Sequence, residues 1–192
     1  MQTTLSNIRT LIDETLGLAV PRNAMARVAL ATSLYIALSV LLPITFHQFG
    51  LGGRIWLPMH IPALLAGFLV GPLSGLIVGA VGPGLSHLLT SMPPLYAVPL
   101  MSMELMMYGL VAGVCYNRLR INVGLSLLLA MVIGRVLFGL GIAVLGSFME
   151  IPYTAGQWFS TAGAMVTGWP GLIVQIAVIP VVVAGWNRKR RW

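Results

Sequence analysis

Two ionisable residues stand inside long apolar stretches of this 192-residue chain, and they are the first candidates for chemistry. Glu104 lies in the run between Leu95 and Asn117, and Arg135 lies in the run that begins at Val123. A charged side chain in a membrane interior costs about 3 kcal/mol or more unless it is paired or hydrated. Two compatible interpretations follow. The two residues form an ion pair that joins two helices, or they line a polar cavity that holds a ligand.

Further polar and aromatic residues near the ends of the apolar runs complete a set of candidate substrate-binding residues. The full set is Arg54, Trp56, His60, His87, Tyr96, Glu104, Arg135, Trp158, Trp169 and Gln175. Tryptophan and tyrosine are also ordinary residues of the membrane interface, so no single aromatic residue is diagnostic. Most of the set gathers on one side, together with the glycine-rich loop Gly50–Gly53, which predicts a pocket that opens on that side.

Catalytic chemistry finds little support in the residue pattern. An intramembrane serine protease needs a serine and a histidine at one depth, but Ser74 and His87 are roughly 20 Å apart along a helix. A haem or quinone subunit would use His60 and His87, which no further haem signature accompanies. We therefore expect no catalytic residue, cofactor or metal, and an intramembrane enzyme or redox subunit is the weakest alternative. No phosphate-binding loop occurs, so the chain is not expected to hydrolyse ATP itself.

The composition identifies the medium in which these residues must be positioned. Hydrophobic residues make up 58% of the chain and charged residues only 8%, whereas a soluble domain carries about 25% charged residues. This excludes a water-soluble enzyme or regulator and leaves no room for a second, soluble domain. The chain is predicted to be one all-α integral membrane domain, residues 1–192.

Apolar runs near the length of about 20 residues that a membrane span needs predict six transmembrane helices. The expected ranges are 24–42, 59–70, 73–90, 95–117, 123–148 and 169–186. Pro43 is expected to end the first helix, and the pair Gly71-Pro72 is expected to turn the chain between the second and third. Residues 150–168 are expected to form a loop with a short re-entrant helix. The division predicted for the whole chain is a short amphipathic interfacial helix over 1–22, the six-helix bundle over 23–187, and a basic tail over 188–192.

The formal net charge of +7 indicates membrane topology. Nine of the eleven cations lie before or at the start of the first span, between the fourth and fifth spans, or at the end of the chain: Arg9, Arg22, Arg27, Arg118, Arg120, Arg188, Lys189, Arg190 and Arg191. Lysine and arginine in short loops mark the cytoplasmic side. We expect a multi-pass protein of the cell membrane with both termini in the cytoplasm and no nucleic-acid partner.

Two stripes of small residues have the four-residue spacing that allows close helix packing in lipid. They are Gly71, Gly75 and Gly79, which run from the expected turn into the third span, and Ala29, Ser33 and Ala37 in the first span. Composition favours packing inside the chain for both stripes, and docking against another protein is the alternative.

One combination of motifs extends through most of residues 57–180. It comprises Met59-His60-Ile61-Pro62-Ala63-Leu64-Leu65-Ala66-Gly67-Phe68, Gly71-Pro72-Leu73-Ser74-Gly75, Leu88-Leu89-Thr90-Ser91-Met92-Pro93-Pro94, Met103-Glu104-Leu105 with Tyr108-Gly109-Leu110, and Thr167-Gly168-Trp169-Pro170-Gly171 with Gln175. The combination resembles the substrate-binding S components of energy-coupling factor (ECF) vitamin transporters. The resemblance implies a six-helix protein that captures a vitamin or related micronutrient from outside and delivers it to the cytoplasm. A transmembrane T component and two ATPase subunits would supply the energy.

The resemblance also implies roles for two regions of the chain. S components dock the T component through an Ala-x-x-x-Ala element on the first helix, and here Ala29-x-x-x-Ser33-x-x-x-Ala37 is the nearest match. Their pocket lies in the outer half and is gated by the first outer loop, which corresponds to Gly50–Gly53. The alternative function is a self-sufficient secondary transporter, but no repeat is visible between the two halves of the chain.

The sequence leaves the identity of the vitamin open. Arg54 and Arg135 favour a carboxylate-bearing vitamin such as pantothenate, niacin or folate, because arginine binds carboxylates bidentately. An unpaired Glu104 would instead favour an amine or an amide-rich ligand such as cobalamin or a nucleoside.

Overall fold

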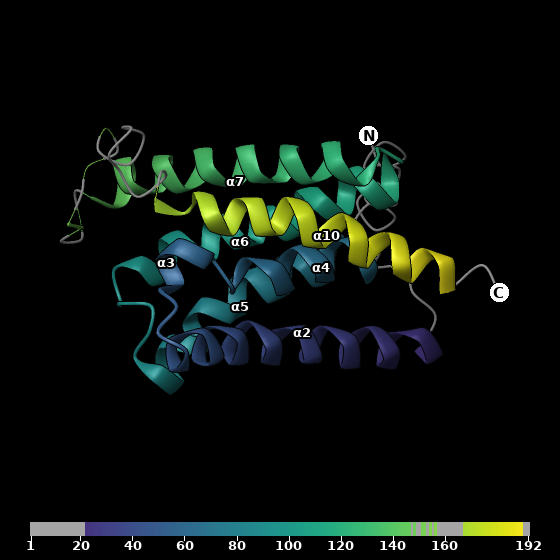
Figure 1. Ribbon diagram of the computed structural model, residues 1–192, viewed down its shortest axis with the longest axis horizontal. Coiled ribbons are helices and arrows are strands. Elements are labelled where there is room, and N and C mark those ends of the chain that lie inside the picture. Colours follow the sequence, from purple (N-terminus) through teal and green to yellow (C-terminus); the bar gives the residue numbers. More distant parts are fainter. Residues whose placement is uncertain are drawn as a thin grey trace, which may run out of the picture.

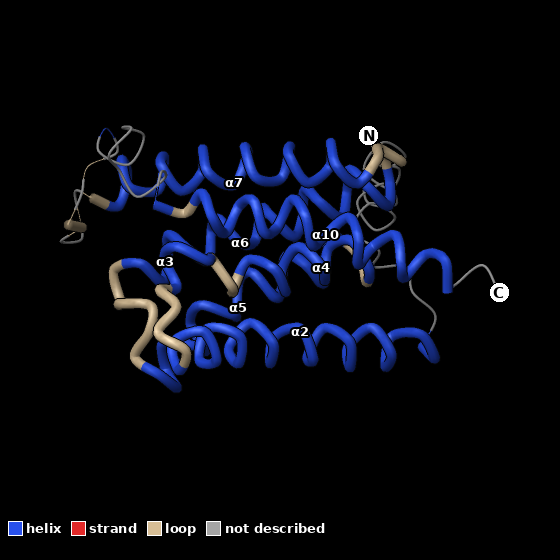
Figure 2. Tube along the Cα trace, in the orientation of Figure 1, coloured by secondary structure: helices blue, strands red, loops and turns tan. Residues whose placement is uncertain are grey.

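The computed structural model of the chain describes residues 22–146 and 167–189, together with 148, 151, 152, 154 and 156. The expected interfacial helix over 1–22 lies outside the described residues, except for Arg22. So do Trp158, most of the expected re-entrant segment, and the last three residues of the basic tail. All regular secondary structure in the described part is helical (Figures 1 and 2).

The described helices vary widely in length. In chain order they are α2 (Arg22–Gln48), α3 (Gly53–Trp56), α4 (His60–Leu69), α5 (Pro72–Thr90), α6 (Ala97–Gly113), the π-helix η1 (Val114–Arg118), α7 (Val123–Leu145) and α10 (Trp169–Lys189). Five segments are long and apolar enough to cross a membrane: Met25–Gln48, Pro72–Thr90, Ala97–Arg118, Val123–Leu145 and Trp169–Trp186. Helix α4 is apolar but has only 10 residues.

Large apolar side chains cover the outside of the bundle. On α7 the exposed residues Leu128, Val132, Val136 and Leu140 follow helical spacing, while the opposite face of that helix is buried. Exposed apolar surface of this extent is not tolerated by a monomeric soluble protein. Together with the five long apolar helices, it makes the chain a multi-pass membrane protein.

The ends of the helices follow the sequence signals in most places. Gly71 has a φ of 142°, a conformation that favours glycine, and Pro72 occupies the first turn of α5, so the expected turn is present. The expectation that Pro43 ends the first helix is wrong, because α2 continues through Pro43 to Gln48. Prolines are tolerated inside membrane helices, where neighbouring groups satisfy the freed backbone atoms. The first loop is also more ordered than expected, because it contains α3.

Helix α6 lies at the centre of the bundle and packs against α4, α5 and α7. Helix α2 packs against α5 and α4, and α10 contacts α3, α4 and α7. The helices alternate in direction, so the start of α2, the α6–α7 connection and the end of α10 lie at one end, opposite α3 (Figure 1). We call this end the basic end, because its segments hold Arg22, Arg27, Arg118, Arg120, Arg188 and Lys189. The opposite end is the α3 end, where most of the longer connections gather (Figure 2).

Glycines bring α6 into backbone contact with α5. A Cβ atom at Gly75 would lie 2.6 Å from the carbonyl oxygen of Gly109, and a Cβ atom at Gly79 would collide with the backbone of Leu105 and Met106. The expectation of internal packing is confirmed for Gly75 and Gly79. Gly71 instead provides the turn between α4 and α5.

The small-residue stripe of α2, in contrast, lies on the outside of the bundle. Ala29, Ser33 and Ala37 are all exposed, so the expectation that this stripe packs inside the chain is wrong. The buried face of α2 is marked by Thr32, whose hydroxyl lies 2.8 Å from the hydroxyl of Ser74 on α5 in a hydrogen bond. That polar contact faces the bundle and leaves the stripe on the outside.

Candidate functional site

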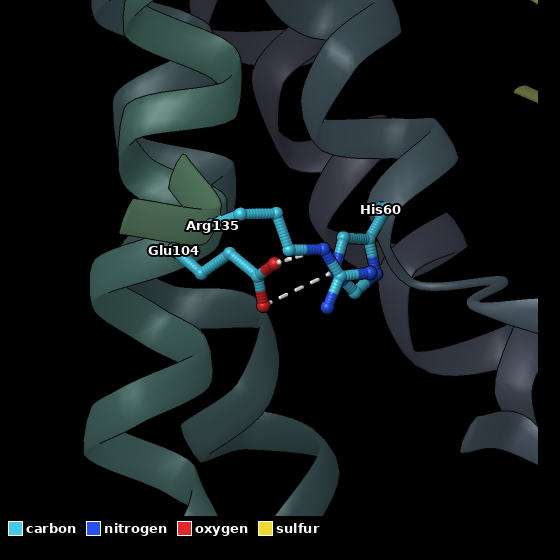
Figure 3. Close-up of polar contacts among 3 residues, drawn as sticks. All are labelled: His60, Glu104 and Arg135. Carbon is cyan, nitrogen blue, oxygen red and sulfur yellow. Dashed lines mark ion pairs between the residues drawn. The ribbon is translucent and has the colours of Figure 1, made fainter. Parts of the chain in front are cut away.

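Three ionisable side chains from three helices meet in the interior of the bundle (Figure 3). The Arg135 Nε atom lies 3.2 Å from Oε1 of Glu104, and the His60 Nε2 atom lies 3.4 Å from Oε2 of the same carboxylate. The exposed fractions of His60, Glu104 and Arg135 are 1%, 2% and 4%. The ion pair that was one of the two interpretations of Glu104 and Arg135 is therefore present, with His60 as a third member. We call these three residues the buried triad.

The helix geometry sets the depth of the buried triad. His60 is the first residue of α4, which starts at the α3 end. Glu104 is seven residues into α6, roughly 10 Å along that helix from the same end. Arg135 lies ten residues before the end of α7, roughly 15 Å from that end. The triad thus lies in the half of the bundle nearer α3.

A glycine allows α7 to approach the triad closely. A Cβ atom at Gly134 would lie 3.1 Å from the backbone carbonyl oxygen of Glu104 and would collide with the ring of Tyr108. The side chain of the next residue, Arg135, reaches the Glu104 carboxylate across this close contact. The absence of a side chain at Gly134 is therefore part of what brings the two charges together.

Tyr108 is a neighbour of the triad that was not included among the candidate residues. Its ring meets the ring of His60 edge to face, with centroids 5.2 Å apart and an angle of 69° between the planes. Tyr108 is fully buried and lies one helical turn after Glu104 on the same face of α6. The four-residue spacing between Glu104 and Tyr108 was the signal in the sequence that could have identified it.

Gln175 is a buried polar residue on α10. It has 0% exposure, and among the described residues neither its amide oxygen nor its amide nitrogen has a hydrogen-bond partner. The Nδ1 atom of His60 likewise has no hydrogen-bond partner among the described residues, whereas its Nε2 atom lies 3.4 Å from the Glu104 carboxylate. Buried polar groups are normally hydrogen-bonded, so each exception calls for an explanation.

The helical face that carries Gln175 points toward α3 and α4. One turn earlier, a Cβ atom at Gly171 would lie 2.5 Å from the backbone carbonyl oxygen of Trp56, at the end of α3. One turn later, Ile179 packs in an apolar cluster with Leu64 and Tyr108. Gln175 therefore lies between the loop helix α3 and the apolar core beneath the triad.

The other candidate residues lie at the α3 end but take no part in the triad. His87 contacts the backbone carbonyl oxygen of Pro93 through Nδ1 at 2.8 Å and so holds the connection between α5 and α6. Tyr96 is half-buried just before α6, Trp56 is half-buried in α3, and Trp169 is exposed at the start of α10. Arg54 belongs to α3. A ligand-binding role for these residues remains a prediction.

Comparison with known proteins assigns the chain to a family. A family model described as the substrate-specific component of ECF transporters matches residues 26–183. The match covers most of the chain, including every residue of the buried triad and Gln175, and the chain belongs to this family. Neither the curated proteins nor the solved structures provide a similar chain.

Proposed function

We propose that this member of the ECF substrate-specific components binds a vitamin or related micronutrient from outside the cell and delivers it to the cytoplasm. It would do so as the S subunit of an importer whose transmembrane T component and two ATPase subunits supply the energy. The chain itself would have no catalytic activity and would require no cofactor.

The observation that carries this proposal is the buried triad together with Gln175, a second buried polar residue. A bundle that needed only stability could fill this volume with apolar side chains, because replacing a buried ion pair by hydrophobic residues is often neutral or stabilising. Ionisable residues inside membrane helices usually mark the path or the site of a substrate. The triad lies beneath the loop helix α3, as a site gated by the first outer loop requires.

The charge distribution supports the proposed orientation. The basic end of the bundle holds six of the eight cations that the described residues contain, and the α3 end holds only Arg54. Because lysine and arginine are enriched in the cytoplasmic loops of membrane proteins, the basic end faces the cytoplasm in this proposal and the α3 end faces outward. In this proposal α4 is a sixth, short span, both termini are cytoplasmic, and the membrane is the cell membrane.

The exposed stripe of α2 supports the proposed partnership. Ala29, Ser33 and Ala37 present little side-chain bulk, so the backbone of another helix can approach closely there. This face is the one through which we propose that the chain docks the T component.

Affinity purification from the native membrane in mild detergent, followed by mass spectrometry, tests this function. The expected result is recovery of a T component and two ATPases, and release of one small molecule from the purified chain on denaturation. Uptake of a solute by the chain alone in proteoliposomes, driven by a proton or sodium gradient, would instead support the secondary transporter.

A further inference from the structure

We propose that the site binds a ligand with an uncharged ring or amide edge that both donates and accepts hydrogen bonds, and that the side chain of Gln175 forms hydrogen bonds with this edge. The chemical class is that of primary amides, lactams and pyrimidinones, as opposed to carboxylates. This inference rests on the proposed function, because it names the class of substrate that the same site takes.

The charge balance of the buried triad argues against an anionic ligand at this position. Glu104 is the one acidic residue among those that the structure describes, and its carboxylate contacts both Arg135 and His60. The charge of Arg135 is matched by that of Glu104. A carboxylate brought beside Arg135 would compete with Glu104 for the same guanidinium and would have to shed its hydration in the membrane interior, which is costly. The preference for a carboxylate that Arg135 suggested in the sequence loses its basis, since the charge of Arg135 is already matched.

The position and chemistry of Gln175 argue for a neutral donor–acceptor edge. Its side chain is fully buried, and within the described part of the chain both amide atoms lack a hydrogen-bond partner. The helical face that it shares with Gly171 and Ile179 packs on Trp56 and on the cluster that contains Tyr108. A glutamine amide presents one acceptor and one donor side by side. The complement of that pair is another amide edge, which would satisfy both orphan atoms at once.

The surroundings suit a flat ring attached to that edge. The rings of Tyr108 and His60 lie edge to face, with an angle of 69° between their planes, and give this part of the bundle an aromatic lining. The Nδ1 atom of His60, which has no hydrogen-bond partner among the described residues, provides one further hydrogen-bonding group. Aromatic faces together with neutral hydrogen-bonding groups favour planar, uncharged heterocycles over flexible acids.

Matched probe pairs test the inference on the purified full-length protein. The pairs are nicotinamide with nicotinate and uracil with orotate, each added at millimolar concentration, and the readout is the melting temperature. Nicotinate has a carboxylate in place of the amide of nicotinamide, and orotate has a carboxylate added to the ring of uracil, so the ring is retained within each pair. We expect nicotinamide, uracil or both to raise the melting temperature, and neither acid to do so. If only the acids stabilise the protein, and Arg54→Gln abolishes that effect, the ligand class is anionic and the inference is wrong, although the proposed function stands.

Gln175→Met separates recognition from a structural role. Methionine has a similar length but no amide, so the variant is expected to weaken probe binding by about tenfold or more. Its melting temperature without probe should stay equal or rise, because an unsatisfied buried amide is removed. Ile176→Met, at an exposed position of the same helix, is the matched control and should bind as the parent does.

The remaining outcomes also decide the question. Unchanged probe binding by Gln175→Met, with a lower melting temperature, would show that Gln175 only stabilises α10 and would overturn the inference. Failure of all four probes to stabilise the protein would overturn it as well. Co-purification of the T component and ATPases tests the proposed function separately in each case.

Discussion

The Nε atom of Arg135 lies 3.2 Å from Oε1 of Glu104, and this contact joins α7 to α6 in the interior of the bundle. Both side chains are almost completely shielded, and the apolar cluster of Leu100, Phe138 and Ile142 packs between the same two helices. In a membrane, where apolar burial does not by itself bring helices together, a specific polar contact of this kind defines which helix faces meet. The pair therefore both orients α7 and matches the charge of Arg135 with that of Glu104.

Glu104→Gln is expected to lower the free energy of unfolding by about 3–5 kcal/mol, because it leaves the Arg135 charge buried without a counter-charge. The reporter is Cys115, a buried free cysteine and the single cysteine of the chain, which reacts with a thiol-specific dye as the protein unfolds on heating. The double variant Glu104→Leu with Arg135→Leu should be more stable than either single variant. Losses that simply add in the double variant would show that the two charges are not coupled.

Gly75→Ala is expected to destabilise the bundle by about 1–3 kcal/mol, because the new methyl group would lie 2.6 Å from the carbonyl oxygen of Gly109 and would force α5 away from α6. Gly84→Ala, on the same helix, is the control, since a Cβ atom there meets nothing within 4 Å. That change should be neutral or raise stability by up to about 1 kcal/mol through helix propensity. Equal melting temperatures for the two variants would contradict the close contact between α5 and α6.

Ala29→Leu and Ala37→Leu are expected to abolish uptake in whole cells and co-purification of the T component, because they add bulk to the exposed stripe of α2. Substrate binding by the purified variants should remain normal, since the stripe faces away from the site. Val181→Leu, at an exposed position of α10, is the control for a larger lipid-facing side chain. If the α2 variants lose substrate binding but still co-purify with the T component, the stripe does not serve docking.

Gly171→Ala is expected to weaken substrate binding about tenfold, which corresponds to about 1.4 kcal/mol. The added methyl group would lie 2.5 Å from the carbonyl oxygen of Trp56 and would displace α3 from the start of α10. Gly185→Ala is the control on the same helix, because a Cβ atom there has no neighbour within 4 Å. The measurement is the amount of small molecule retained per mole of purified protein. Equal retention by both variants would show that the seating of α3 on α10 does not affect the site.

Local signals in the sequence predicted most of the helices. The pair Gly71-Pro72 marks the turn between α4 and α5, where the φ of 142° at Gly71 requires glycine. Asn122 immediately precedes α7 and caps it, because its side chain accepts a hydrogen bond from the backbone amide of Leu125 at 2.8 Å. Pro43 misled the prediction, because the rule that proline ends a helix comes from water, whereas a membrane helix has no solvent to stabilise its broken end.

The two small-residue stripes show where local pattern was insufficient. Both have the same four-residue spacing, yet Gly75 and Gly79 lie against α6, whereas Ala29 and Ala37 are exposed. A spacing identifies a helix face that can pack closely but carries no information on what it packs against. The difference depends on the other face of each helix, such as the contact between Thr32 and Ser74 that holds α2 on α5.

The sequence by itself determined that the chain lies in a membrane, where most of its helices run and which charged residues lie inside them. Each of these depends on composition or on residues within a few turns of one another. That Glu104 and Arg135 could form an ion pair between two helices followed from their positions inside two apolar runs. The tertiary structure decided that His60 and Tyr108 join them, and that Gln175 is buried near α3 with no hydrogen-bond partner among the described residues, because these arrangements involve four helices far apart in the chain. They depend on how each helix is rotated about its axis, which is set by the packing of all its neighbours together.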